Sequence, residues 1–323
     1  MGKPDGDIKD KLHKGSTMIL PMNMQEKAIA INASTTYSLK HRLKDYGQLM
    51  KFRLSFSVVF SSAMGYLLAC KGGIVWVDFI NLCLGGLLIV GASNGINQII
   101  ERNYDKLMTR TENRPMATQR LGLVEASIFC LILGVAGVLT LGFGLNKLTG
   151  LLGLLSLISY AFVYTPLKRV TSWSVHVGAF PGATSPMIGW VAYTGAIDAG
   201  AIILFVFQFV WQFPHFWSIA WILNDDYLKA GYNMLPSKGG RNKNSALQSL
   251  IFAIALLPLC FAMYYFNYVG IYSTLLAAII TLYFIYTAFR LYLTLEIKDA
   301  KRLMFASFFY FPIIFIAFLI DKI

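Results

Sequence analysis

The feature that most constrains this sequence is a succession of apolar runs, each about long enough to cross a lipid bilayer. A hydrocarbon core about 30 Å thick requires roughly 20 apolar residues in a helix. The runs lie at about 53–70, 76–100, 122–144, 148–165, 174–194, 199–223, 247–267, 270–292 and 303–320. The sequence therefore predicts an all-α fold, a polytopic membrane bundle of nine transmembrane helices.

The composition excludes the main alternative classes of protein. Of the 323 residues, 56% are hydrophobic and 14% are charged, whereas ordinary soluble domains are about 45–50% apolar. These values argue against a soluble globule, and they exclude a disordered chain because disorder requires low hydrophobicity and high net charge. The four cysteines lie inside apolar runs without the spacing of a zinc or disulfide framework. We expect them to be small core residues.

The distribution of Lys and Arg predicts an orientation in the membrane. If the N-terminus is cytoplasmic, the loops on that side carry fifteen Lys and Arg, and the opposite loops carry two, Lys71 and Lys147. Cytoplasmic loops typically show this excess, so we expect a multi-pass protein of the cell inner (plasma) membrane with a cytoplasmic N-terminus. The net charge of +12 then reflects topology. No nucleic-acid partner is expected, since that would require the cations on one exposed face.

The N-terminal part differs in composition from the rest of the chain. Residues 1–45 are polar and mixed in charge, whereas residues 46–323 hold all the apolar runs. We expect residues 1–45 to be a disordered cytoplasmic tail with a short interfacial helix at its end, because apolar residues from Leu39 to Met50 recur at helical spacing. Residues 46–323 are expected to form the transmembrane domain.

Three oxygen-bearing side chains follow the second apolar run at helical spacing. Asn97, Glu101 and Asp105 stand at i, i+4 and i+8, which stacks them on one helical face. Like charges at this spacing repel, so a cation is expected between them. Oxygen ligands favour Mg²⁺, which proteins commonly hold with one or two carboxylates and substrate phosphates. A solvated helix end with locally paired charges is the alternative.

A second acidic pair ends the sixth run on the same expected side of the membrane. Asp225 and Asp226 could face the first group across a cavity and hold magnesium ions against a diphosphate. Ordinary solvation at a helix end is the alternative. The candidate catalytic residues and metal ligands are thus Asn97, Glu101, Asp105, Asp225 and Asp226.

Cationic residues accompany both acidic groups. Guanidinium and ammonium groups pair well with phosphate oxygens, so these side chains are candidates for diphosphate binding. They are Arg102, Arg110, Arg114, Lys168, Arg169 and Lys229. Alone, Lys168 and Arg169 would read as an ordinary pair of cytoplasmic cations.

Two histidines lie inside expected spans. His215 follows Pro214 in the sixth run, between Trp211 and Trp217. An ionisable residue inside a membrane is a functional candidate by default, with a hydrogen-bonded structural role as the alternative. His176, in the fifth run, has a stronger structural alternative.

Four segments together resemble a known family, and the resemblance extends from about residue 46 to the C-terminus. The segments are Asn97 to Pro115, Tyr164 to Arg169, Trp211 to Trp217, and Asp225 to Pro236. They resemble the protoheme IX farnesyltransferases, or haem O synthases, of the UbiA-type intramembrane prenyltransferases. The resemblance implies a nine-helix bundle, Mg²⁺, farnesyl diphosphate and haem b as substrates, and haem O as product for a terminal oxidase. Haem A synthase or terminal oxidase assembly proteins are the partners implied.

Position by position, the resemblance places Asn97, Glu101 and Asp105 in a first metal-diphosphate motif, and Asp225 with Asp226 in a second. Glu101 stands where the wider superfamily usually has Asp, and adjacent aspartates are usual in the haem branch. The haem-contact candidates are His215, Trp211, Trp217 and His176, the last standing where the family is usually apolar.

The mechanism that the resemblance implies is electrophilic alkylation. Magnesium-assisted ionisation of the diphosphate gives a farnesyl cation, a haem vinyl group attacks it, and water captures the resulting cation. The leading alternative is a UbiA-type prenyltransferase that acts on an aromatic quinone precursor, which would need the same first motif. A polytopic transporter is a third hypothesis, although its polar groups should lie near the bilayer midplane.

Overall fold

The structure is a computed structural model that describes residues 39–323. Most of the expected tail, residues 1–38, lies outside the described residues. Residues 44–323 form one compact unit. The helices are α2 (Leu39–Met50), α3 (Phe52–Ala69), α4 (Trp76–Asp105), α5 (Leu123–Gly144), α6 (Lys147–Ile158), the π-helix η1 (Ser159–Tyr164), α7 (Thr165–Leu167), α8 (Ser174–Thr194), α9 (Ala199–Ile222), α10 (Asn224–Lys229), α11 (Lys243–Tyr265), α12 (Ile271–Thr294) and α13 (Ile297–Ile320).

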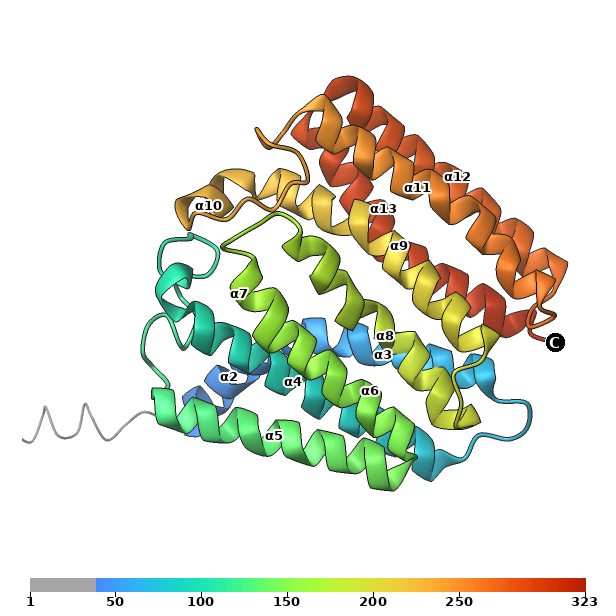
Figure 1. Ribbon diagram of the computed structural model, residues 1–323, viewed down its shortest axis with the longest axis horizontal. Coiled ribbons are helices and arrows are strands. Elements are labelled where there is room, and N and C mark those ends of the chain that lie inside the picture. Colours follow the sequence, from blue (N-terminus) through green and yellow to red (C-terminus); the bar gives the residue numbers. More distant parts are fainter. Residues whose placement is uncertain (1–38) are drawn as a thin grey trace, which may run out of the picture. The chain divides into compact units, whose positions relative to one another are not determined.

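The helices of the compact unit pack as a bundle (Figure 1). α4 lies against α5, α3 against α8, and α8 against α9, while α12 packs against both α11 and α13. Among residues 39–323, strand-type pairing is limited to one isolated bridge between Val269 and Lys322. The predicted all-α class is therefore confirmed.

The expected count of spans differs from the structure at one helix, α8. Within residues 39–323, eight helices are long and apolar enough to cross a membrane. α8 has 21 residues but contains Pro181, Pro186 and several Gly, Ser and Thr, which makes it less apolar than the other eight. It packs against α3, α6 and α9, and most of its residues are buried. A helix enclosed by its neighbours meets little lipid, so its sequence need not be continuously hydrophobic.

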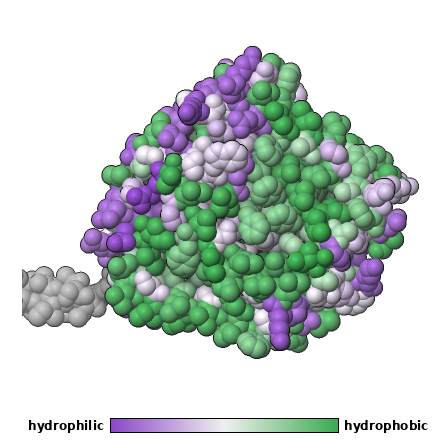
Figure 2. Space-filling model, in the orientation of Figure 1, coloured by the Kyte–Doolittle hydropathy of each residue, from purple (hydrophilic) through white to green (hydrophobic). Residues whose placement is uncertain are grey.

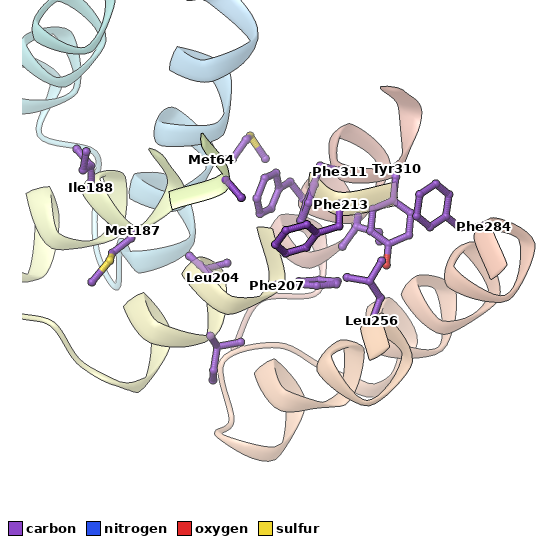
Figure 3. Close-up of a cluster of buried hydrophobic side chains, with 14 of the residues drawn as sticks. Met64, Met187, Ile188, Leu204, Phe207, Phe213, Leu256, Phe284, Tyr310 and Phe311 are labelled. Carbon is purple, nitrogen blue, oxygen red and sulfur yellow. The ribbon is translucent and has the colours of Figure 1, made fainter. Parts of the chain in front are cut away.

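Aromatic packing joins α9 to the C-terminal helices (Figure 3). Phe207 of α9 contacts Phe311 of α13 edge to face, with ring centroids 5.2 Å apart. Tyr310 of α13 lies 5.0 Å from Phe284 of α12 between ring centroids. Such pairs add about 0.5–1.5 kcal/mol beyond the burial of their area. They fix α12 and α13 against α9.

The surface has a hydrophobic side and a polar end. Figure 2 shows hydrophobic residues over most of the visible face, with hydrophilic residues along the upper left edge, where Figure 1 places α10. We call this edge the polar end. It carries α10, the connection 106–122 between α4 and α5, and the connection 168–173 between α7 and α8.

Glycines permit the close approach of α3 and α8. A Cβ atom at Gly189 of α8 would overlap the backbone carbonyl of Ser62 in α3, and one at Gly65 of α3 would overlap the carbonyl of Pro186. Small residues at such crossings let helix backbones approach closely in membranes. The position of α8 in the bundle therefore depends on these two glycines.

We predict that Gly189→Ala destabilises the bundle by about 1–3 kcal/mol, because the new methyl group meets backbone atoms that cannot move aside. Thermal unfolding of the purified protein in detergent would measure this. Gly72→Ala is the matched control, because a Cβ at Gly72 meets open space. Equal unfolding temperatures for the two variants would contradict the proposed packing.

Candidate active site at the polar end

The three residues of the first acidic motif lie buried on the last turns of α4. Asn97, Glu101 and Asp105 are 1%, 3% and 0% exposed. Asn97 Nδ2 donates to Glu101 Oε2 over 2.9 Å, so the expected stacking on one helical face is present. α4 continues through Asp105, whereas its apolar run was expected to end near residue 100. The extra turn therefore carries the carboxylates beyond the apolar part of the helix.

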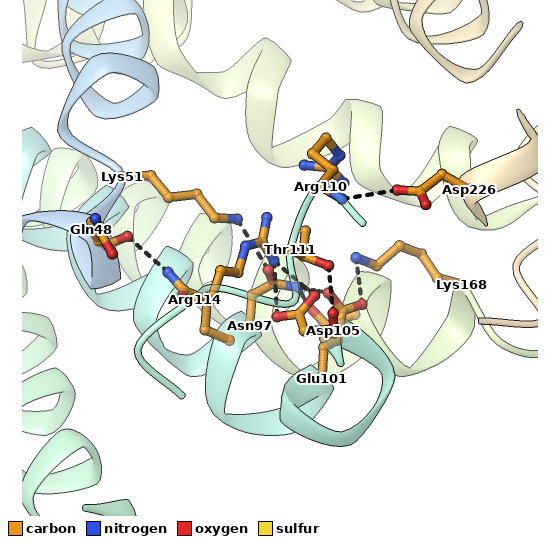
Figure 4. Close-up of polar contacts among 12 residues, drawn as sticks. Gln48, Lys51, Asn97, Glu101, Asp105, Arg110, Thr111, Arg114, Lys168 and Asp226 are labelled. Carbon is orange, nitrogen blue, oxygen red and sulfur yellow. Dashed lines mark hydrogen bonds and ion pairs between the residues drawn. The ribbon is translucent and has the colours of Figure 1, made fainter. Parts of the chain in front are cut away.

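Cations from three other segments contact these side chains (Figure 4). Arg114 Nη1 donates to both carboxylate oxygens of Asp105 over 2.9 Å. Lys168 Nζ lies 2.5 Å from Glu101 Oε1. Lys51 Nζ donates to Asn97 Oδ1 over 3.1 Å. The positive charge that the repulsion between Glu101 and Asp105 required is thus supplied by the protein itself.

Lys51 is a site residue that the sequence reasoning missed. It lies between α2 and α3 in the left-handed backbone region, with φ of 51°. Burial and the neighbouring cations Arg114 and Lys168 hold its pKa well below the ordinary lysine value. An anion bound beside Lys51, Arg114 and Lys168 would relieve this repulsion and favour the charged form of Lys51.

The π-helix η1 positions another missed residue, Thr165. Its hydroxyl donates to the carbonyl of Tyr160, five residues earlier, over 2.9 Å. The same oxygen accepts from Asn97 Nδ2 over 3.2 Å. Short π-helical segments often occur at functional sites. Here the segment orients the amide of Asn97 toward its neighbours.

Asp226 connects α10 to the segment that follows α4. Its carboxylate accepts from the backbone N–H groups of Thr109, over 2.9 Å, and Arg110, over 3.2 Å. Lys229 Nζ donates to it over 3.0 Å. Partial burial raises the pKa of Asp226, but the hydrogen bonds from Lys229, Thr109 and Arg110 outweigh that effect and hold the pKa below its ordinary value. Asp226 therefore holds the 106–122 connection over the end of α4.

Asp225 does not join this group. Its side chain is 76% exposed and pairs with Arg241 Nη1 at 3.1 Å. Within residues 39–323, no three His, Cys, Asp or Glu side chains lie close enough together to form a metal site. Asn97, Glu101 and Asp105 thus lie together on α4. Asp226 is linked to them through the 106–122 connection, and Asp225 lies apart from the group.

The remaining candidate cations take different positions. Lys229 donates to Thr109 Oγ1 over 2.8 Å, and Arg110 lies over the ring of Tyr227, so both remain near Asp226. Arg102 instead donates to the backbone carbonyl of Ile99 in its own helix. Arg169 lies 4.3 Å over the ring of Tyr104.

Tyr232 is a further residue near the acidic face that the sequence reasoning missed. It is 1% exposed, and its hydroxyl has no hydrogen-bond partner within the described residues. Lys168 Nζ lies 5.8 Å from its ring. Burial, followed by the charges of Glu101 and Asp105, raises the pKa of Tyr232 above its ordinary value. The hydroxyl therefore stays protonated and lies close to the Glu101 carboxylate.

The two histidines occupy different environments. His215 Nδ1 shares a 2.7 Å hydrogen bond with Ser307 Oγ of α13, and its ring stacks on Trp211. These contacts suit the structural alternative. His176 packs 6.0 Å from Trp217 between ring centroids, and its buried Nδ1 has no hydrogen-bond partner among residues 39–323.

An apolar cavity lies deeper in the bundle. It is a small, partly open hollow bounded by α3, α4, α5, α6 and α8, and its walls include Val59, Gly86 and Val90. Val90 precedes Asn97 on α4 by seven residues, which is about 10 Å along a helix. An apolar chamber therefore lies in the bundle about two turns below the charged face.

The sequence and the fold both resemble those of known prenyltransferases. Residues 58–313 match the family model described as the UbiA prenyltransferase family. The chain is 44% identical to the protoheme IX farnesyltransferase of Cytophaga hutchinsonii, over 86% of this chain and 97% of that protein. It is 34% identical to the mitochondrial protoheme IX farnesyltransferase of Homo sapiens, over 99% of this chain and 70% of that protein.

Solved structures share the fold at lower sequence identity. A digeranylgeranylglyceryl phosphate synthase superimposes with a TM-score of 0.72 at 21% identity, over 87% of this chain and 98% of that one. A UbiA homologue from Archaeoglobus fulgidus bound to GPP and Mg²⁺ gives a TM-score of 0.64 at 15% identity, over 85% and 99% of the two chains. These two likenesses establish the arrangement of helices.

We predict that Asp226→Ala speeds hydrogen exchange at the Thr109 and Arg110 amides by about tenfold or more, because each loses a hydrogen bond to a charged group. Exchange mass spectrometry of the 106–122 segment would measure it. Since the pKa of Asp226 is lowered, wild-type protection should persist above about pH 4 and fall as the pH drops through that lowered pKa.

Asp225→Ala is the matched control, because Asp225 contacts only Arg241 among its charged neighbours. Equal protection in the two variants would show that Asp226 does not hold the connection.

Proposed function

The chain belongs to the UbiA prenyltransferase family, and we propose that it transfers a farnesyl group from farnesyl diphosphate to a vinyl group of haem b, with addition of water, to give haem O. The names of its relatives support the substrate pair. The observation that carries the proposal is the buried face of Asn97, Glu101 and Asp105, paired with cations and located above an apolar chamber. This arrangement suits a substrate with a charged head and an apolar chain.

The acidic face fits a magnesium ion. Its donors are all oxygens, as Mg²⁺ prefers, and Glu101 Oε1 is buried with a cation, Lys168 Nζ, already beside it. The residues that would hold the ion are Asn97, Glu101 and Asp105, with Asp226 contributing from the second motif through the 106–122 connection. Asp225 would have to leave its pair with Arg241 to contribute. The ion would supply positive charge against the diphosphate and so favour cleavage of the allylic C–O bond.

The protein's own cations would bind the diphosphate oxygens. Arg114 and Lys168 already lie against the acidic face, and Arg110 and Lys229 lie on the segments joined by Asp226. Preorganised charges that stabilise a departing group are often the largest contribution to catalysis. Arg102 and Arg169 contact other groups, the carbonyl of Ile99 and the ring of Tyr104. We assign them a supporting role at the rim of the site.

The apolar chamber would bind the farnesyl chain. Each buried CH₂ contributes about 0.8 kcal/mol, and walls such as Val59 and Val90 would exclude water from the reactive cation. For the acceptor, His215 and His176 are the proposed haem contacts. His215 bonds Ser307 through Nδ1, so its contact with haem would use Nε2. Trp211 and Trp217 would contribute apolar surface.

The location follows from the same arrangement. The chain is a membrane protein by its spans and its family, and we propose the inner membrane with the polar end and the N-terminus on the cytoplasmic side. Haem A synthase or terminal oxidase assembly proteins remain predictions as partners, since they would receive the product. No contact with nucleic acid is part of the proposal.

Two rival functions are less well supported. A prenyltransferase for an aromatic quinone precursor would use the same carboxylates, but the named relatives are farnesyltransferases of haem. A transporter would place its polar groups near the bilayer midplane, whereas Glu101 and Asp105 lie at the end of α4.

The direct test is incubation of the purified protein with haem b, farnesyl diphosphate and Mg²⁺, followed by mass spectrometry of the haem. We expect haem that has gained a farnesyl group and a water molecule. Prenylation of an aromatic acceptor, with haem unchanged, would support the quinone alternative and refute this proposal.

We predict that Asp105→Asn lowers turnover by at least about 100-fold, because the acidic face loses a carboxylate that would hold the divalent cation against the departing diphosphate. Glu112→Gln, an exposed residue on the neighbouring connection, should retain nearly wild-type turnover. Elution of both variants as single species in detergent would exclude misfolding. Normal turnover in the Asp105 variant would remove the acidic face from the mechanism.

Removal of divalent cations with EDTA should abolish turnover, and added Mg²⁺ should restore it, because the oxygen donors at α4 bind hard cations. The measurement is the rate of diphosphate release before and after readdition. Undiminished release in EDTA would contradict a role for a divalent cation.

A further inference from the structure

A second cavity opens at the polar end beside the acidic face. It lies between the 168–173 connection and the loop that joins α10 to α11, and it encloses about 830 Å³, part of it open to solvent. Lys168 lines it and also contacts Glu101. The cavity and the proposed diphosphate site therefore share one residue.

The lining of this cavity is strongly positive. Lys168, Arg169 and Lys238 contribute three cations, and the other polar side chains are Asn, Ser and Thr. The lining residues include no Asp or Glu. Within residues 39–323, neither Arg169 nor Lys238 forms an ion pair. A concave surface with unpaired positive charge attracts an anion.

Hydrogen bonds hold the loop around Lys238 in place without a ligand. Asn242 Nδ2 donates to Ser237 Oγ and to the carbonyl of Lys238, each over 3.0 Å. Ser245 Oγ donates to the carbonyl of Gly240 over 2.8 Å. Gly240 adopts φ of 73°, a left-handed conformation that glycine takes without strain. A loop ordered in advance loses less entropy when it binds.

We propose that this basic cavity binds the carboxylate groups of the acceptor, an inference that rests on the proposed function. Haem b is an apolar macrocycle with carboxylates along one edge, so it needs cations at the membrane surface and apolar contacts below. The 168–173 connection leads directly into Trp173 and His176, whose rings lie 4.6 Å apart between centroids. Cations and planar rings therefore follow one another along this part of the chain.

Position favours a carboxylate over the diphosphate as the anion. Arg114 contacts Asp105, and Arg110 lies beside Asp226, so cations other than those of the cavity already surround the proposed diphosphate position. Arg114 and Arg110 do not line the cavity. Arg110 and Arg114 on one side and Lys238 on the other would keep the two anionic substrates apart, while Lys168 and Arg169 lie between the two sites.

The test compares haem b with haem b dimethyl ester, whose carboxylates carry no charge. Equilibrium binding of each to the full-length protein in detergent is followed by absorbance, for the wild type and Lys238→Gln. We expect Lys238→Gln to weaken binding of haem b by about fivefold or more, the range for an exposed charged contact, and to leave binding of the ester unchanged. Lys301→Gln, at an exposed position on α13, is the matched control and should change neither affinity.

Three results would overturn the inference. Equal weakening of haem b and its ester would give Lys238 no role toward the carboxylates. A raised KM for farnesyl diphosphate with unchanged haem affinity would assign the cavity to the diphosphate. Unchanged affinities for all three ligands would show that the cavity binds no substrate. Failure of the proposed function is distinguishable, because the wild type would then bind haem b or farnesyl diphosphate without forming farnesylated haem.

Discussion

The pairing of the buried acidic face of α4 with cations from distant segments determines much of the structure around it. Glu101 and Asp105 are almost wholly buried, and a charge removed from water is costly unless it is paired. Lys168 and Arg114 come from separate connections, so those connections must be ordered for the carboxylates to remain charged. Breaking one buried pair typically costs about 3–5 kcal/mol, a large fraction of the stability of a protein.

The same pairing gives a physical reason for anion binding. The cations neutralise the carboxylates in the protein alone. A divalent cation bound by the carboxylates would free Arg114 and Lys168 to pair with the diphosphate oxygens. The connections that supply the cations lie at the polar end of the bundle, where Asp226 holds the 106–122 connection. The apolar chamber lies in the opposite direction along α4. An amphipathic substrate therefore has one favourable orientation.

Much of the fold could be predicted from the sequence because the membrane imposes strict limits on helix length. Nine spans were expected from the apolar runs, and eight helices within residues 39–323 have the length and composition of a span. Spacing alone placed Asn97 and Glu101 on one face. The sequence could not show that α8 is enclosed and hence less apolar, because enclosure depends on neighbours distant in the chain. It also could not show that adjacent Asp225 and Asp226 point to different partners.

The missed site residues have a common explanation. Lys51 and Thr165 lie outside the recognised acidic motifs, and only the folded chain brings them within 3.2 Å of Asn97. A lone lysine or threonine does not by itself indicate a functional site. The position of Lys51 at the start of a span and that of Thr165 before a proline are the only sequence features that could have marked them as candidates. The haem-contact prediction for His215 rested on its position in the membrane, and the contact with Ser307 supplies a structural role that only three-dimensional packing could reveal.

The central claim is that the acidic face of α4 holds a divalent cation against the diphosphate. Electron paramagnetic resonance with Mn²⁺ in place of Mg²⁺ tests it directly, through the coupling of the metal to the phosphorus nuclei of a non-hydrolysable farnesyl diphosphate analogue. We expect phosphorus coupling in the wild-type protein and its loss in Glu101→Gln. The same coupling in both proteins would place the metal elsewhere and contradict the account.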